Sequence, residues 1–190
     1  MRFPPEPVKE KIILSTVSAW ELGDQFASTQ AQKNEALREA KVAKLDGDLS
    51  ENAPYQAAKE KFRTMGRIQR RLTGEMDHLL KEGHRLVDPL TWVNHTVPEA
   101  VELGTVVAMD LDGEHEKFLV AGARDHHVPN EGDILPLPYT SPLGHALMGK
   151  REKESFSVTI GETMRSVKIH AIRHPTREEI LAIFPALKEG

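Results

Sequence analysis

The sequence predicts an α+β fold, in which an N-terminal antiparallel α-helical coiled coil is followed by a small, mainly antiparallel β-sheet domain with a short helix. Two observations support this prediction. Apolar residues repeat with a helical spacing over residues 55–79, whereas beyond about residue 100 they alternate with polar residues as in strands. The chain has 190 residues, enough for two small domains with cores of their own. We expect an N-terminal arm and coiled coil over 1–87, a linker over 88–100 and the sheet domain with a terminal helix over 101–190.

The composition narrows the classes of function. Apolar residues make up 39% and charged residues 28% of the chain, which is typical of a soluble globular protein. The chain has no cysteine, which excludes disulfides, thiolate metal sites and thiol catalysis. No apolar run approaches the roughly 20 residues of a membrane span, and the first residues lack the apolar region of a secretory signal. We therefore expect a cytoplasmic protein without a membrane partner.

The first helix is predicted from about Lys11, after an irregular arm with three prolines over residues 1–10. Ile13, Val17, Trp20 and Phe26 can share one side of it. Five alanines continue this apolar stripe: Ala27, Ala31, Ala36, Ala40 and Ala43. The pair Gly23-Asp24 is the candidate position for an interruption.

The second helix has a clearer pattern. Its apolar residues are spaced alternately three and four apart, with one polar exception: Tyr55, Ala58, Phe62, Met65, Gln69, Leu72, Met76 and Leu79. Pro54 suits a first helical turn, and Asn52 or Ser50 can cap it. A helix from Ala53 to Glu82 is about 45 Å long and, with a single apolar stripe, needs a partner helix. We expect that partner to be the first helix, reached through a turn at Gly47.

The free end of this coiled coil, residues 46–54, is called the tip. It holds three acids, Asp46, Asp48 and Glu51, and no basic residue. A basic run follows on the second helix: Lys59, Lys61, Arg63, Arg67, Arg70 and Arg71. From spacing alone, the acids are most simply a solvated loop at a helix N-terminus, and the basic run a solvated face. The net charge of the whole chain is only −4, which argues against a general nucleic-acid binder. The basic run therefore predicts a positively charged surface that is confined to one segment.

Two strand pairs are predicted in the sheet domain. Residues 104–112 and 116–121 flank Gly113, and residues 154–160 and 163–172 flank Gly161-Glu162; both read as hairpins. Residues 125–142 are rich in Pro, Gly and Asp and are expected to be mostly loop.

Two helices are predicted beside these strands. The first covers 141–149, with Ser141 as its cap, Pro142 as its first residue and Gly149 as its stop. After Pro175, Thr176 and Glu179 predict a capping box for a last helix to about Lys188.

Two motifs resemble a known family. Gly47-Asp-Leu-Ser-Glu-Asn-Ala-x-Tyr55, continued by Ala58-Lys-Glu60, is similar to the tip motif of the bacterial Gre transcript-cleavage factors. Ser141-Pro-Leu-x-x-Ala-Leu-x-Gly149-Lys150 is similar to their second signature. The resemblance covers roughly residues 30–174. It implies that the sheet domain is FKBP-like and docks on the rim of the secondary channel of bacterial RNA polymerase.

The resemblance also implies roles. The coiled coil enters the channel, where Asp48 and Glu51 help to hold a second Mg²⁺ that is shared with the polymerase. The polymerase then hydrolyses backtracked RNA, so that this chain is not itself an enzyme and is expected to be a monomer without a bound cofactor of its own. Supporting roles fall to the remaining motif residues: Ser50, Asn52 and Tyr55 at the tip, the six basic residues in contact with the RNA 3′ end or channel walls, and Ser141, Pro142, Gly149 and Lys150 in docking.

Some positions depart from the family pattern and leave alternatives open. Pro54 replaces a common acidic or polar residue, and Gly144-His145 replace a usual Ala-Arg pair. One alternative is a Gre-fold regulator or inhibitor that enters the channel without stimulating cleavage, and another is an adaptor for some other partner. His126-His127 is the best histidine candidate for a metal site, although two solvated loop histidines explain it more simply. Trp20 and Trp92 are expected to be packing residues, and an FKBP-like fold does not by itself imply prolyl isomerase activity.

Overall fold

The computed structural model describes residues 12–46, 52–81, 84–127 and 132–188. The chain divides into two compact units. One unit runs from Trp20 to Gly83 and contains most of both long helices; the other is formed by the described residues on either side of it. We describe each unit by itself.

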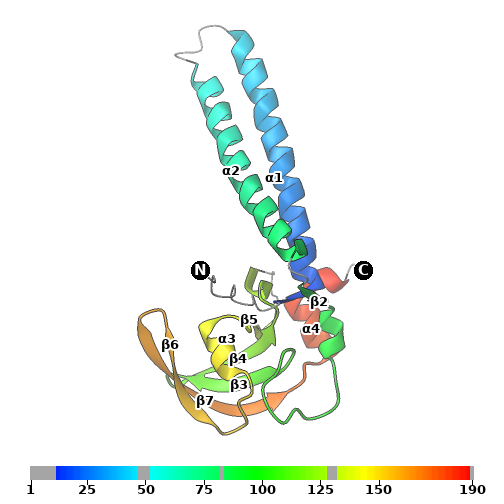
Figure 1. The fold of residues 1–190 in the computed structure, drawn as a ribbon, viewed down its shortest axis with the longest axis vertical. Coiled ribbons are helices and arrows are strands. Elements are labelled where there is room, and N and C mark those ends of the chain that lie inside the picture. Colours follow the sequence, from blue (N-terminus) through cyan, green and yellow to red (C-terminus); the bar gives the residue numbers. More distant parts are fainter. Residues whose placement is uncertain (1–11, 47–51, 82–83, 128–131, 189–190) are drawn as a thin grey trace, which may run out of the picture. The chain divides into compact units, whose positions relative to one another are not determined.

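Two long antiparallel helices form the first unit (Figure 1). Helix α1 spans Thr16–Ala43 and is continued by a 3₁₀ turn, η1, at Lys44–Asp46; helix α2 spans Ala53–Lys81. The coiled coil that the heptad spacing predicts is therefore confirmed. Helix α1 passes through Gly23-Asp24 without a break.

The packing stripe of α1 differs from the predicted one. A series of its buried and half-buried positions is spaced alternately four and three apart: Leu22, Phe26, Thr29, Lys33, Ala36, Ala40 and Ala43. Ala27 and Ala31 are exposed, and Trp20 is 55% exposed, so the predicted packing of these three residues is wrong. Because two members of this series, Thr29 and Lys33, are polar, a search for apolar residues alone does not find its spacing.

The predicted stripe of α2 is correct. Ala58 and Leu72 are buried, and the other stripe residues from Tyr55 to Leu79 are half-buried. Its polar position, Gln69, meets the polar position of α1: Lys33 Nζ donates to Gln69 Oε1 over 2.7 Å, and Gln69 Nε2 donates to Gln30. Two polar stripe positions therefore satisfy each other inside the coiled coil.

The second unit is built on a five-stranded sheet in the order β5-β4-β3-β7-β6. Three neighbouring pairs are antiparallel, and β4–β5 is parallel. The strands are β3 (Val106–Leu111), β4 (Glu114–Ala121), β5 (Leu135–Pro138), β6 (Ser155–Ile160) and β7 (Thr163–Arg173).

Both predicted hairpins are present. Asp112 and Gly113, with φ of 53° and 90°, connect β3 to β4, and Gly161, with φ of 64°, begins the turn between β6 and β7. Positive φ at these positions is what two-residue hairpin turns require.

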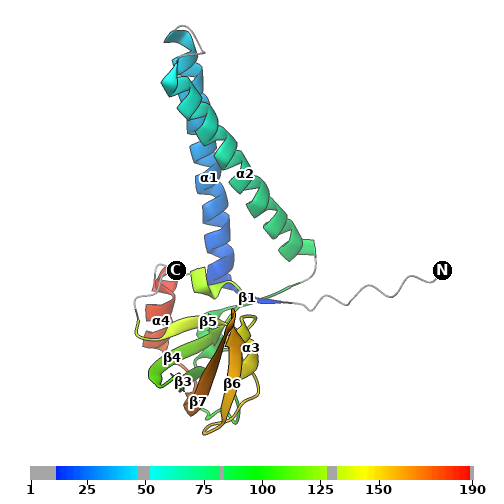
Figure 2. The same cartoon turned by 90° about the vertical axis from the view of Figure 1, so that its left-hand side faces the viewer.

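The two faces of this sheet pack against different helices (Figure 2). On one face, helix α3 (Pro142–Leu147) buries Leu143 and Leu147 against the strands. On the other, helix α4 (Arg177–Ile183) packs with Trp92 and Phe184. Trp92 is therefore a packing residue, as predicted, and the Thr176–Glu179 capping box is present, although α4 ends at Ile183 and a 3₁₀ turn, η4 (Pro185–Lys188), follows.

Three short elements correct the sequence prediction. Strand β1 (Ile13–Ser15) occupies the expected start of the first helix and pairs in parallel with β2 (Arg85–Val87). The 3₁₀ helix η2 (Pro89–Trp92) lies within the expected linker. Strand β5 lies in the expected loop 125–142, next to a 3₁₀ turn, η3, at Asp125–His127. Its prolines argued against a strand, but β5 is at the edge of the sheet, where proline is tolerated.

Candidate functional site

The tip is described only at its two flanks. Helix α1 and η1 lead into it as far as Asp46, and α2 leaves it from Ala53. Asp48, Ser50 and Glu51, to which sequence reasoning gives the central roles, lie outside the described residues. The structure therefore bears on these three residues through what holds the chain on either side of them.

Asn52 joins both flanks of the tip. Its side-chain amide donates to the backbone carbonyl of Ala43, the last residue of α1, over 2.6 Å. Its side-chain oxygen accepts from the backbone N–H of Tyr55 over 2.9 Å, and its carbonyl accepts the first helical bond from Gln56. Asn52 is thus the cap of α2 and a clamp on the end of α1. The clamp closes the loop of eight residues that contains Asp48 and Glu51.

Pro54 and Tyr55 occupy the first turn of α2. Pro54 is the second residue of the helix and is exposed. A first-turn N–H has no partner within the helix, so proline at this position costs no hydrogen bond. Tyr55 is half-buried on the packing stripe, and its ring lies 5.8 Å from Nζ of Lys59. These residues stiffen the flank that follows Glu51.

The basic run does not form a single face. Lys61 lies toward α1, where Nζ is 3.2 Å from Glu39 and 3.4 Å from Glu35. The hydrogen bond that Lys61 donates to Glu39 is the main reason that the pKa of Lys61 is raised above its ordinary value. Lys61 therefore holds the two helices together, and its charge is largely compensated there.

Three arginines of the run border a groove of about 500 Å³ on the other side of α2. Its lining consists of Lys33, Glu60, Phe62, Arg63, Gly66, Arg67 and Arg70, and we call it the cationic groove. Glu60 pairs with Arg67 at 3.1 Å and with Arg63 at 3.9 Å, whereas Lys33 Nζ lies 5.5 Å from the Phe62 ring centroid. Four cations and one carboxylate line this surface, so its charge suits an anionic ligand.

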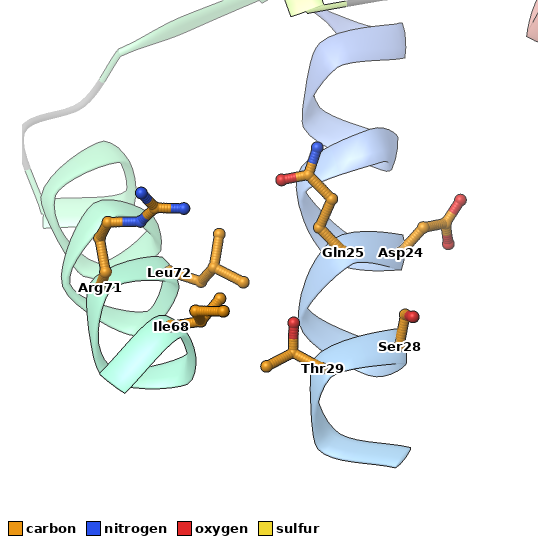
Figure 3. A pocket seen from close by; sticks show the side chains of 7 residues that line it. All are labelled: Asp24, Gln25, Ser28, Thr29, Ile68, Arg71 and Leu72. Atoms are coloured by element: carbon orange, nitrogen blue, oxygen red, sulfur yellow. The ribbon is translucent and has the colours of Figure 1, made fainter. Parts of the chain in front are cut away.

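A second hollow lies between the same helices, further from the tip (Figure 3). Its volume is about 420 Å³. In Figure 3 the apolar side chains of Ile68 and Leu72 point from α2 toward Gln25 and Thr29 of α1. Small and polar partners leave this part of the coiled coil less filled, in keeping with the separation of α1 and α2 toward the end of α2 in Figure 2.

The second motif forms helix α3 and its flanks. Ser141 Oγ accepts from the N–H of Gly144 over 3.1 Å and donates to the carbonyl of Pro138 over 2.7 Å. Pro142 begins the helix, and Gly149 has a φ of 76° after it. Lys150 Nζ lies 3.4 Å from Glu154 and 5.3 Å from the Phe156 ring centroid. Each of the four residues assigned to docking has a local structural role as well.

The space around position 144 explains why a glycine occupies it. A Cβ at this position would lie 2.1 Å from the carbonyl oxygen of Pro138 and 2.9 Å from Cα of Tyr139. Both are backbone atoms, so a larger residue requires the connection between β5 and α3 to move. His145, beside it, is exposed.

The family models match both parts of the chain. The model for the N-terminal region of the transcription elongation factor matches residues 19–82, and the model described as transcription elongation factor GreA/GreB, C-terminal, matches residues 96–174. A transcription elongation factor GreA from Syntrophobacter fumaroxidans is 34% identical over 143 residues, which cover 73% of this chain and 81% of the relative. The chain belongs to the GreA/GreB family of transcription elongation factors.

Other members of the family match this chain over a similar length. GreA of Nautilia profundicola is 34% identical over 149 residues, covering 78% of this chain and 84% of the relative. GreA of Paracoccus denitrificans is 30% identical and is covered over 99% of its length, against 87% of this chain. The crystal structure of Gfh1 from Thermus thermophilus covers 86% of this chain and 99% of its own, at 19% identity and a TM-score of 0.33, a likeness too weak to support any inference.

The two family matches cover different candidate regions of the chain. The N-terminal match contains the tip, its clamp Asn52 and the cationic groove, and the C-terminal match contains the sheet and α3. Helix α4 begins at Arg177, beyond the C-terminal match, and its core residues Ile180 and Ile183 complete one face of the sheet domain. In this Gre factor helix α4 is therefore part of the core of the sheet domain.

One cluster of side chains escaped sequence reasoning. Among the described residues, Asp110, His115 and His170 bring donor atoms within 4.8 Å of one another. The hydrogen bond from His170, and then the one from His115, lower the pKa of Asp110. His126-His127 drew attention because the two are adjacent in sequence, whereas only the register of three strands reveals the actual cluster. Asn52 was one of two cap candidates in the sequence, because a cap residue has a local signature, whereas its bond to Ala43 was not predicted.

Proposed function

We propose that this Gre factor binds bacterial RNA polymerase, inserts its coiled coil into the secondary channel and stimulates the polymerase to hydrolyse backtracked RNA. Membership of the family supports the partner and the channel. The observation that carries the proposal within this chain is the Asn52 clamp, which ties the loop bearing Asp48 and Glu51 to the ends of two long helices. A loop held at both ends presents its carboxylates with little loss of conformational entropy.

The donor set at the tip fits Mg²⁺. Carboxylate oxygens are the hard ligands that this ion prefers, and one or two protein carboxylates commonly share it with phosphate and water. Asp48 and Glu51 are three residues apart, so in a turn both carboxylates can point the same way. When bound there, the ion supplies Lewis acidity and activation of water for phosphodiester hydrolysis. The part of this chain is to hold and orient the two carboxylates.

The cationic groove extends this proposal along α2. Arg63, Arg67 and Arg70 present guanidinium groups that suit RNA phosphates or acidic walls of the channel. The motif residues Ser141, Pro142, Gly149 and Lys150 are proposed to support docking at the rim of the channel. Acting on RNA polymerase places the factor in the bacterial cytoplasm.

Transcript cleavage in stalled, backtracked polymerase complexes tests the proposal. We expect the wild-type factor to accelerate cleavage, and Asp48→Ala or Glu51→Ala to reduce this effect by at least about tenfold. Asp46→Ala is the matched control, because it removes a carboxylate from the same tip without an assigned role, and it should retain cleavage. A wild-type factor that adds nothing to cleavage by polymerase alone would refute the proposal. Slower nucleotide addition without transcript shortening would identify a channel inhibitor in its place.

A further inference from the structure

Three side chains from three neighbouring strands meet on the sheet. Asp110 lies on the central strand β3, His115 on β4 and His170 on β7. Asp110 Oδ1 lies 3.2 Å from His115 Nδ1, and Asp110 Oδ2 lies 2.8 Å from His170 Nε2. The two imidazole rings have centroids 5.5 Å apart and are tilted by 39°. We call these three residues the His–Asp cluster.

The backbone arrangement brings these groups together. His115 is the direct cross-strand partner of Asp110. On the other side, the register of β7 shifts by one residue: Ala108 is paired with Ala171 and Met109 with Ile169, which leaves His170 as the extra residue of a β-bulge. Bulges redirect side chains and are common beside functional sites. In the observed register Asp110 is paired with Lys168, and His170 lies two residues further along β7 at the bulge, where its Nε2 reaches the Asp110 carboxylate.

We propose that the His–Asp cluster is a binding site for a divalent transition-metal ion of the Zn²⁺ type. Two imidazoles and one carboxylate are a common ligand set for such ions, whereas Mg²⁺ and Ca²⁺ prefer oxygen ligands alone. With bonds near 2.0 Å, tetrahedral ligand atoms lie about 3.3 Å apart. The observed separations of 3.2 and 2.8 Å are to the two different oxygens of Asp110, and one donor atom from each residue lies within 4.8 Å of the others, so binding an ion requires the three side chains to draw together around it.

The accessibility of the cluster suits exchange of the ion with solvent. The side chains of Asp110 and His170 are 34% and 35% exposed, and that of His115 is 58% exposed. Three protein ligands leave a coordination position open to water or to a donor atom of a partner. The site lies in the sheet unit, whereas the tip lies in the coiled coil, so it is independent of the proposed cleavage function.

Calorimetric titration of the full-length, tag-free factor with Zn²⁺ tests this proposal. We expect one ion per chain, and His115→Ala, His170→Ala and Asp110→Asn each to weaken binding by at least about tenfold, because each removes one of three ligands. The control is His95→Ala, since His95 is an exposed histidine of the same unit outside the cluster, and it should bind as the wild type does. Millimolar Mg²⁺ should not compete.

A second measurement does not depend on the variants folding. The visible spectrum of the wild-type factor loaded with Co²⁺ should show the intense bands of a four-coordinate site with nitrogen ligands, and Zn²⁺ should abolish them at one equivalent. The absence of saturable binding, or binding that is equal in the wild type and the three cluster variants, would overturn the proposal. The three residues would then form a hydrogen-bonded network only.

Discussion

At the scale of single residues, Asn52 makes the contacts with the widest consequences. Its amide group serves both helices at once, as donor to Ala43 and as acceptor for Tyr55. Helix ends leave backbone groups without partners, and here one side chain satisfies a C-terminal carbonyl and an N-terminal N–H together. Asn52 therefore fixes both described ends of the segment whose sequence contains Asp48 and Glu51.

We predict that Asn52→Ala lowers the free energy of unfolding of the coiled coil by about 1–2 kcal/mol, as the loss of a good N-cap does. Asn52→Asp should cost less, because it keeps the acceptor for Tyr55 and loses only the donor to Ala43. Urea unfolding followed by far-UV circular dichroism measures both. If Asn52→Ala is as stable as the wild type, the clamp described for the tip is wrong.

Glu179 gives a pH-dependent prediction for the sheet unit. The two guanidinium nitrogens of Arg173 donate to its carboxylate over 2.6 and 2.7 Å, and the N–H of Thr176 donates over 2.9 Å. The bonds from Arg173, first, and the one from Thr176 hold the pKa of Glu179 below its ordinary value of 4.5. A lowered pKa in the folded state means that the stabilisation is present above pH 4.5 and is lost as the pH falls below it.

We therefore expect Glu179→Gln to lower stability by about 1 kcal/mol near neutral pH and to flatten the loss of stability below pH 4.5. The matched control is Glu178→Gln, since Glu178 is an exposed neighbour on the same helical turn and should leave the pH profile unchanged. Trp92 fluorescence in a Trp20→Phe background reports on the sheet unit alone, because Trp92 is buried in its core. Equal pH profiles for both variants would contradict the role of the Arg173 pair.

At the scale of secondary-structure elements, the packing of α1 against α2 rests on an unusual layer. Lys33 and Gln69 are both stripe positions, and they satisfy each other together with Gln30. Polar residues at such positions cost stability and select one pairing and register of the helices. The proposed function requires the tip to be presented in one orientation, and such selection would serve it.

We predict opposite effects for single and double substitutions in this layer. Gln69→Leu alone leaves the ammonium group of Lys33 without its acceptor in a half-buried place and should destabilise the coiled coil by about 1–2 kcal/mol. Lys33→Met combined with Gln69→Leu removes both polar partners and should recover that loss or exceed it. Urea unfolding of the four proteins of this double-mutant cycle gives the coupling. Additive effects would show that the two residues do not interact.

The same layer shows where sequence reasoning succeeded and where it failed. The stripe of α2 was predictable because seven of its eight members from Tyr55 to Leu79 are apolar and evenly spaced. That of α1 was not, since Thr29 and Lys33 interrupt it and surface alanines such as Ala27 imitate it. A pattern of apolar residues reveals the packed face of a helix only when the residues packed on that face are themselves apolar.

Strands and sites that depend on distant pairing were also beyond sequence reasoning. The prolines of β5 concealed a strand that needs only its partner β4, and β1 becomes a strand only through β2. The family motif indicates the tip because its residues are contiguous, and this stays a prediction, since Asp48 and Glu51 lie outside the described residues. The His–Asp cluster was not predictable, since its three members are 5 and 55 residues apart and meet through sheet register and a bulge.

At the scale of the whole molecule, the distribution of charge separates function from stability. The six basic residues of α2 carry equal formal charges but face different surroundings. Lys61 is paired with Glu35 and Glu39 of α1, whereas Arg63, Arg67 and Arg70 border the cationic groove. Lys61 faces two carboxylates, whereas the four cations of the groove share the single carboxylate of Glu60, so the groove keeps a net positive charge that can attract a polyanion or an acidic wall.

Salt dependence distinguishes the two groups. We predict that Arg63→Ala, Arg67→Ala and Arg70→Ala each raise the factor concentration needed for half-maximal transcript cleavage and lower the slope of its logarithm against log salt by about 1, as loss of a phosphate contact does. Lys61→Ala removes the same charge but should leave that slope unchanged, while it lowers the stability of the coiled coil only to a small extent, because the pairs that it breaks between the helices are exposed. Since each variant changes the net charge by the same amount, a common shift in slope would mean that only the overall charge matters. A change confined to the three arginines would assign the electrostatic contact to the groove.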